Sequence, residues 1–276
     1  MYGPDSFSSP SGLSTLERAR LPIISAALLL HRPTVFAKPE WKLLPWSRYP
    51  DRKNLLQNLL DILADCPGLF IEKDGIDTGL SGQEANAGYQ LLSEKARGLI
   101  EELAQWEKVW TAHHPECYHE RLSPATTPTS SALHGQVLPI WSTVLEYQSL
   151  YHAKAMTLYN TTRILLLKYT QEVSLPKREL AGEEQVFSRD IFAAGMKICR
   201  SMDYYLDHIQ KGTGDFFLLF PLRMAFDAVG PCNWEIRAWL KNVLHLVSSG
   251  PVSRWAAAKS ILDWKTRGKR QRAYGV

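Results

Sequence analysis

The stretch that decides the fold runs from residue 82 to residue 114 and reads GQEANAGYQLLSEKARGLIEELAQWEKVWTAHH. Its apolar residues recur at spacings of 4, 3, 4, 3 and 4, and they are Leu92, Ala96, Leu99, Leu103, Trp106 and Trp110. Such spacings place side chains on one face of an α-helix. Glu94, Glu101 and Lys108 fall on the other faces. The stretch therefore predicts one long amphipathic helix with a single buried stripe.

Helical periodicity recurs along the rest of the chain. We expect Asp51 to cap a leucine-rich helix that ends at Pro67 and Gly68. Further helices are predicted over 138–171, over 188–209 with Ser188 as N-cap, over 234–249 after Asn233, and over 254–265 after Ser253. No stretch shows the sustained alternation of a strand. We therefore predict an all-α fold, a multi-helix array of roughly seven to nine helices in one large domain.

Composition suggests where that domain begins and ends. Residues 1–19 are predicted to be a flexible leader, and residues 20–264 the helical domain. Inside it, the stretch RLSPATTPTSSALHGQ at 121–136 is rich in Pro, Ser and Thr, which is typical of a loop. Residues 265–276 form a basic tail.

The apolar run GDFFLLFPLRMAFDAVG at 214–230 is too short for a membrane span, which needs about 20 apolar residues. In an all-α chain we expect one buried helix, or two short ones that meet near Pro221, with Asp215 available as a cap. Arg223 needs an acidic or carbonyl partner if it is buried.

The net charge of +4 comes from the tail, because five basic residues lie there and leave the rest of the chain at −1. These residues are Lys265, Arg267, Lys269, Arg270 and Arg272. The tail is either a nuclear-import or phosphate-contacting segment, or a solvated end. The N-terminus lacks a basic region followed by an apolar one, so we expect neither secretion nor membrane insertion.

Two groups of residues are candidate metal sites. His113, His114, Cys117 and His119 could bind zinc, but their spacing matches no standard zinc pattern, which favours a polar loop after the long helix. Asp203 and Asp207 lie one helical turn apart, yet no second acidic cluster completes a magnesium site. We expect no metal. The four cysteines, Cys66, Cys117, Cys199 and Cys232, are far apart and are predicted to be free thiols.

Patterns that carry catalysis are missing from the sequence. KGTGDFF has two glycines without the rest of a phosphate-binding loop, and GLSGQ places Ser81 wrongly for a nucleophile elbow. Nine tryptophans and eleven tyrosines at helical spacing more often fill a core than line a pocket. We therefore expect neither an enzyme nor a cofactor.

Four segments together resemble the C-terminal regulatory region of fungal zinc-cluster transcription factors, the fungus-specific transcription factor domain. They are HRPTVFAKPEWKLLPW with LLQNLLDILADCPGLF after it, LYNTTRILLLKY, ICRSMDYYLDHIQKGTGDFFLLFPLRMAF, and WLKNVLHLVSSG. They occur in the family order and cover about residues 20 to 264.

The resemblance implies a regulatory or interaction role in the nucleus, or in both the cytoplasm and the nucleus. It implies protein partners such as a full-length regulator or the transcription machinery, with a metabolic gene cluster as the expected target. An unknown small-molecule effector fits this role as well. Family members typically carry a six-cysteine zinc cluster and a basic linker, and this chain has neither. Direct DNA binding is therefore not expected, and the chain is expected to be a truncated product, a fragment or a stand-alone partner of a regulator.

Two alternatives stay open at this point. One is an enzyme or small-molecule-binding protein that uses an apolar cavity between helices. The other is a non-functional remnant whose first helices expose large apolar faces.

Overall fold

The computed structural model describes residues 3–123, 141–174, 181–208 and 216–248. The prediction of an all-α fold is confirmed: the α-helices in these ranges, α1 to α9, fall within the expected number, and one two-stranded sheet accompanies them. The chain divides into two compact units, Met1–Pro115 with Lys154–Ile191, and Glu116–Ala153 with Phe192–Val276. The residues predicted as one large domain, 20–264, are distributed over both units.

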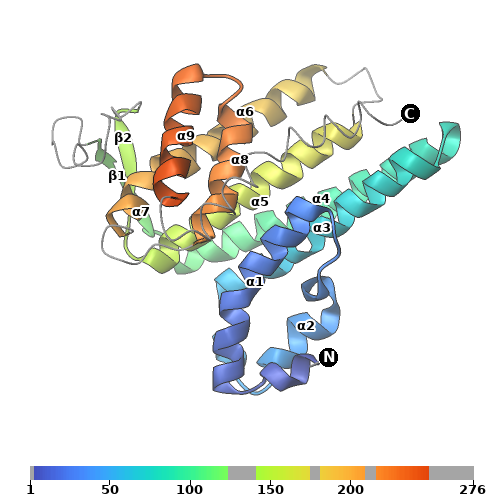
Figure 1. The fold of residues 1–276 in the computed structure, drawn as a ribbon, viewed down its shortest axis with the longest axis horizontal. Helices are drawn as coiled ribbons and strands as arrows, with labels where there is room; N and C mark the ends of the chain where they lie inside the picture. The colour runs from blue at the N-terminus through green and yellow to red at the C-terminus, as the bar shows by residue number, and fades with distance from the viewer. Residues whose placement is uncertain (1–2, 124–140, 175–180, 209–215, 249–276) are drawn as a thin grey trace. The chain divides into compact units, whose positions relative to one another are not determined.

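The described residues of the first unit form helices and the connections between them. In chain order it contains η1 (Pro4–Phe7), α1 (Pro10–Leu30), η2 (Val35–Ala37), α2 (Pro39–Leu43), η3 (Leu44–Trp46), η4 (Pro50–Arg52), α3 (Leu55–Gly79), α4 (Gly82–His113), and the larger parts of α5 (Leu150–Ser174) and α6 (Ala181–Arg200). Helix α3 packs against both α1 and α4, and Figure 1 shows α3 and α4 running antiparallel.

The predicted flexible leader is corrected from Pro4 onward. Ser9 caps α1, because its hydroxyl accepts a hydrogen bond of 3.1 Å from the Gly12 amide. Leu13 and Leu16 are then buried in the first unit. Residues 1–12 are mostly polar, so no pattern in them indicates a helix in which Leu13 is the first buried residue.

Helix α3 also differs from its prediction. Asn54 is its cap, through a hydrogen bond of 3.1 Å from the Gln57 amide to Oδ1, whereas Asp51 lies in η4. The helix continues through Pro67 to Gly79. Proline inside a helix costs about 3 kcal/mol. Pro67 is buried, and the packing of α3 against α1 and α4 offsets that cost.

Helix α4 confirms the predicted stripe, since all six apolar residues are buried. Trp106 stacks on Trp110 and on Tyr159 of α5, with ring centroids 5.2 and 5.7 Å apart. Its indole nitrogen also donates a hydrogen bond of 2.7 Å to the Leu55 carbonyl at the start of α3. One aromatic side chain therefore joins α3, α4 and α5.

The second unit combines a β-ribbon with helices. It contains β1 (Tyr118–Leu122), β2 (Thr143–Tyr147), the first turn of α5, the last part of α6, α7 (Met202–His208), η7 (Phe216–Leu218), α8 (Leu219–Val229) and α9 (Trp234–Ser248).

The β-ribbon is a correction to the sequence prediction. The strands pair antiparallel, with Tyr118 opposite Tyr147 and Leu122 opposite Thr143. Helix α5 therefore begins at Leu150 and not at residue 138. Of the predicted loop, residues 121 and 122 belong to β1, and residues 124–136 lie outside the described ranges. Residues 119–122 of β1 are all exposed, and β2 buries the adjacent residues Val144 and Leu145, so neither strand carries the alternation of period two that would predict it.

The segment predicted as one helix over 188–209 forms two helices. Helix α6 begins at Ala181, so Ser188 lies within it and is not its cap. Ser201 separates α6 from α7, and its hydroxyl is 2.7 Å from the Tyr147 hydroxyl of β2. The polar contact that Ser201 makes with β2 lies at the point where the helix is interrupted.

The apolar run folds as η7 followed by α8. The boundary lies at Leu218, and Pro221 occupies the first turn of α8, where proline is tolerated. Arg223 is 2% exposed, and its Nε lies 3.1 Å from Asp227, the acidic partner that burial required. The predicted Asp215 cap lies outside the described residues. Asn233 caps α9 as predicted, since its Oδ1 accepts from the Glu235 and Ile236 amides.

Helices α6 and α8 approach closely at Gly195. A Cβ atom added there would lie 2.8 Å from Val229 Cγ1 and 2.9 Å from Ala228 Cβ. Gly98 of α4 gives the opposite case, because no atom lies within 4 Å of an added Cβ.

Gly195→Ala is expected to lower the free energy of unfolding by about 1 kcal/mol, because the cost of overpacking exceeds the gain in helix propensity. Gly98→Ala is the matched control, and it should raise that free energy by about 0.5–1 kcal/mol. Urea unfolding followed by circular dichroism compares the two. A change of the same sign in both variants would contradict the close approach of α6 and α8.

Candidate functional site

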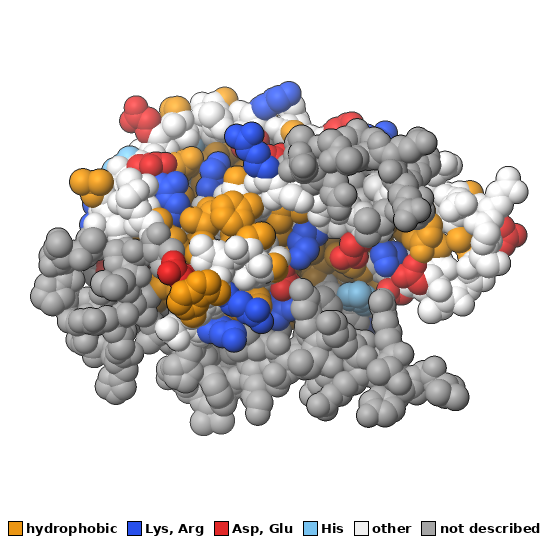
Figure 2. Space-filling view, turned by 90° about the horizontal axis from the view of Figure 1, so that it is seen from above, with side chains coloured by type: hydrophobic (Ala, Val, Ile, Leu, Met, Phe, Trp, Pro, Cys, Tyr) orange, Lys and Arg blue, Asp and Glu red, His pale blue; other side chains and the backbone are white. Residues whose placement is uncertain are grey.

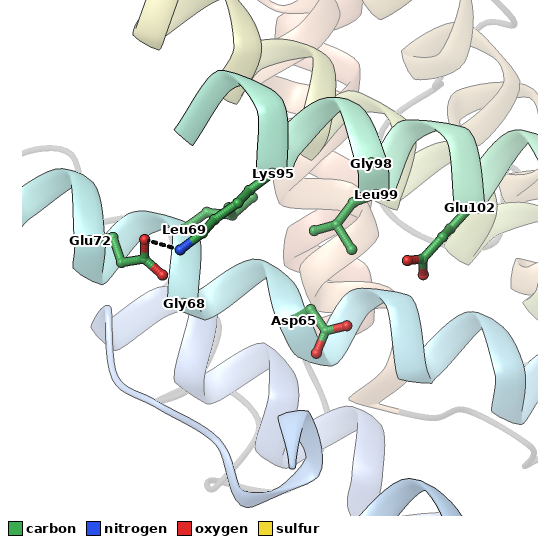
Figure 3. Close-up of a pocket in the computed structure, with 8 residues that line it drawn as sticks. All are labelled: Asp65, Gly68, Leu69, Glu72, Lys95, Gly98, Leu99 and Glu102. Atoms are coloured by element: carbon green, nitrogen blue, oxygen red, sulfur yellow. Dashed lines mark hydrogen bonds and ion pairs between the residues drawn. The ribbon is translucent and has the colours of Figure 1, made fainter. Parts of the chain in front are cut away.

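A groove of about 260 Å³ lies between α3 and α4 (Figure 3). Four residues of each helix line it, namely Asp65, Gly68, Leu69 and Glu72 from α3, and Lys95, Gly98, Leu99 and Glu102 from α4. On both helices these positions follow the spacing i, i+3, i+4 and i+7, which belongs to a single helix face. Each helix therefore contributes one glycine and one leucine, with an ionisable side chain before and after them.

Two leucines and two glycines form the floor of the groove. Leu69 is 4% exposed and Leu99 is 9% exposed, so the leucines belong to the core of the first unit. No atom lies within 4 Å of a Cβ added at Gly68 or Gly98. The missing side chains leave the hollow, and the floor beneath it is apolar.

Charge is distributed unequally along the groove. At one end Lys95 Nζ lies 2.5 Å from Glu72 Oε2, so these two charges neutralise each other. At the other end Asp65 and Glu102 extend from opposite helices, as Figure 3 shows. Glu102 forms no hydrogen bond or ion pair with any described residue. This end of the groove therefore presents an acceptor of hydrogen bonds that can take a cation.

The helices around the groove are acidic as well. Helices α3 and α4 carry ten acidic residues against four lysines and arginines, whereas the whole chain has a net charge of +4. Side chains of both signs are interspersed on the face drawn in Figure 2. The local charge of the α3–α4 hairpin is thus a better guide to its partners than the net charge.

Asp65 is held in place by lysines from the segment before α3. Lys42 Nζ of α2 donates to both carboxylate oxygens of Asp65, at 2.8 and 2.6 Å. Lys53 Nζ donates to the Lys42 carbonyl at 2.8 Å and lies 2.8 Å from Asp61 Oδ2. These contacts connect one wall of the groove to the N-terminal part of the unit.

At the end of this chain of contacts lies Arg20, which is fully buried on α1. Its guanidinium pairs with Asp61 of α3, and Nη1 donates 2.8 Å to Gln57 Oε1 and 3.2 Å to the Gln57 carbonyl. The rings of Phe36 and Trp46 lie 5.8 and 5.9 Å from its Cζ. Burial lowers the pKa of the Arg20 guanidinium, and the Asp61 carboxylate opposes that effect.

The pKa of Asp65 is raised, and burial is the main cause. Lys42 acts in the opposite direction through its hydrogen bonds and charge, while the neighbouring Asp61 carboxylate adds to the increase. Desolvation therefore outweighs the ion pair at this wall of the groove.

The four residues of the candidate zinc site make other contacts. His113 Nδ1 lies 2.8 Å from the Val109 carbonyl, and His114 packs on the Trp110 ring at 4.4 Å. Cys117 is buried, and His119 lies in β1 opposite Glu146. Across the described ranges, no group of three or more His, Cys, Asp or Glu side chains is arranged to hold a metal ion.

The acidic pair considered for magnesium lies on a helix of the second unit. Asp203 and Asp207 lie on α7, and burial raises the pKa of Asp203, with a smaller contribution from Asp207. The basic residues of the tail, Lys265, Arg267, Lys269, Arg270 and Arg272, lie outside the described residues. In the part of the chain that the structure describes, no helix has the length and apolar content for a membrane span.

Sequence reasoning missed the groove, although its signal was present. The spacing of Gly98 and Leu99 on the predicted helix was visible. On α3, however, only Asp65 precedes the predicted end at Pro67 and Gly68, and Leu69 and Glu72 lie beyond it. A search of protein-family models, curated proteins and solved structures found no match to this chain.

Arg20→Met is expected to lower the free energy of unfolding by about 3 kcal/mol, because breaking a buried ion pair leaves its partners without compensation. In this variant Asp61 still forms its ion pair with Lys53, which limits the loss of stability. The double variant Arg20→Met/Asp61→Leu should recover part of that stability. Denaturant unfolding of the variants measures both effects, and a loss below about 1 kcal/mol for Arg20→Met would contradict the buried pair.

The Asp65 carboxyl is expected to have a pKa above the ordinary value of an aspartate, and Lys42→Met should raise its pKa further because the opposing charge is removed. Since the folded pKa is then above the unfolded one, this group lowers stability as pH rises from the unfolded pKa through the folded pKa. Carbon NMR of the carboxyl group measures both pKa values. A pKa below the ordinary value would contradict the dominance of burial.

Proposed function

We propose that this chain is a regulatory, non-catalytic interaction protein of the kind formed by the regulatory region of fungal zinc-cluster transcription factors. It acts by contacting protein partners in the nucleus, such as a full-length regulator or the transcription machinery. DNA recognition then belongs to the partner. A metabolic gene cluster is the proposed target of this control.

The observation that carries the proposal is the α3–α4 groove. It joins an apolar floor to an acidic end, which suits the recognition of a side chain better than the chemistry of a substrate. Two of its four ionisable groups, Glu72 and Lys95, neutralise each other, and Asp65 is bound by Lys42.

The ordered resemblance of the four segments supports the same role. LLQNLLDILADCPGLF lies on α3 and so supplies one wall of the groove, including Asp65, Gly68 and Leu69. Because the comparisons found no match, the family assignment depends on these segments alone.

A small-molecule effector is the second candidate that the groove favours. Pockets for drug-sized ligands usually have roughly 300–1,000 Å³. The groove has about 260 Å³ and fits a single amino-acid side chain or a small amine more closely.

The proposal is tested by fusing the whole chain to a heterologous DNA-binding domain and measuring a reporter gene in a fungal host. A regulatory protein should activate or repress the reporter relative to the DNA-binding domain alone. An unchanged reporter, with the fusion present in the nucleus, would count against the proposal.

The tail is tested separately by replacing Lys265, Arg267, Lys269, Arg270 and Arg272 together with Gln in a fluorescent fusion. If the tail is an import segment, nuclear fluorescence should fall while the thermal unfolding of the protein is unchanged. Equal nuclear fluorescence would leave the solvated-end interpretation in place.

A further inference from the structure

We propose that the α3–α4 groove is a docking site for an arginine or lysine side chain of a partner protein. The cationic head binds at the Glu102 end, and the aliphatic stem lies over Leu69 and Leu99. This inference deepens the proposed function, since it names the chemistry that the partner must present.

The shape of the groove suits such a side chain. Long basic side chains carry an apolar stem and a charged head, and they bury the stem while the head stays at the polar end. The hollow above Gly68 and Gly98 receives the stem, because no atom of the protein would occupy the position of a Cβ there. The leucine floor then contacts methylene groups and not charge.

The charges give the direction of binding. The Glu72 end is already neutralised by Lys95 at 2.5 Å, so it offers little to an incoming cation. Glu102 is the carboxylate that forms no ion pair with a described residue. Asp65 lines the groove from the opposite helix and is bound by Lys42, so it contributes through its remaining lone pairs.

The surrounding helices favour a protein segment over a free amine. The ten acidic residues of α3 and α4 extend well beyond the groove, and they attract a partner that carries several basic residues. Complementary charge of this kind raises the association rate and excludes acidic partners. A partner segment can place one basic side chain in the groove while its other basic residues contact the acidic surface of α3 and α4.

The test uses the whole chain labelled with nitrogen-15 and a helical peptide of alanines with arginine at every fourth position. The matched probe is the same peptide with citrulline, which keeps the shape and removes the charge. NMR titration should show shifts of the Gly68 and Gly98 amides with the arginine peptide and at least tenfold weaker binding of the citrulline peptide, as expected for charge-assisted hydrogen bonds.

Variants locate the binding. Glu102→Gln should weaken binding of the arginine peptide about threefold to tenfold, and its neighbour Glu101→Gln should leave it nearly unchanged. Gly98→Leu should abolish binding by filling the hollow, and Gly75→Leu on α3 is its control. Circular dichroism checks that each variant is folded. If Gly98→Leu does not fold, the pair Glu102→Gln and Glu101→Gln decides.

Three results would overturn the inference: equal binding of the citrulline peptide, equal effects of Glu102→Gln and Glu101→Gln, or tighter binding of spermidine than of the peptide at the same amides. If the peptide shifts amides elsewhere on the protein, the groove is excluded as the docking site, while the proposed regulatory function is unaffected. If the peptide shifts amides of the groove but the reporter fusion is inactive, the results support the docking site and contradict the proposed regulatory function.

Discussion

The burial of the Arg20 guanidinium is the constraint on which the N-terminal part of the first unit depends. A buried cation is tolerated only when its partners are in place together, since desolvation costs several kcal/mol. Asp61 and Gln57 supply acceptors from α3, while Phe36 and Trp46 supply aromatic faces from η2 and η3. If α1 and α3 separated, both the Arg20 guanidinium and the Asp61 carboxylate would lose their charge partner, and if η2 or η3 moved away, the guanidinium would lose an aromatic contact. The pair thus specifies one arrangement of α1, η2, η3 and α3 as well as stabilising it.

The same constraint extends to the groove through a short series of contacts. Asp61 also binds Lys53, which donates to the carbonyl of Lys42, and Lys42 holds both oxygens of Asp65. The wall of the groove is therefore oriented by residues that do not line it. The floor has a different origin, because Leu99 belongs to the buried stripe of α4 and Leu69 to the core face of α3. A binding surface of this kind combines a rigid apolar base with a carboxylate positioned by neighbouring helices.

Periodicity predicted the parts of the fold that depend on one helix face. The α4 stripe and the Asn233 cap were readable because each involves residues three or four apart. The β-ribbon, the helix break at Ser201 and the passage of α3 through Pro67 depend on contacts between distant segments, which no local pattern contains. Arg20 left a signal, since it occupies a position of the α1 stripe otherwise filled by apolar residues. The groove left a signal on α4 only, where Gly98 lies beside Leu99.

Native-state hydrogen exchange of Arg20→Met against the unaltered protein tests the central claim most directly. If the buried guanidinium holds the N-terminal helices on α3, amides of α1, α2 and the first half of α3 should lose protection, and those of α8 and α9 should keep theirs. Unchanged protection in α1, or an equal loss in α8 and α9, would contradict the account.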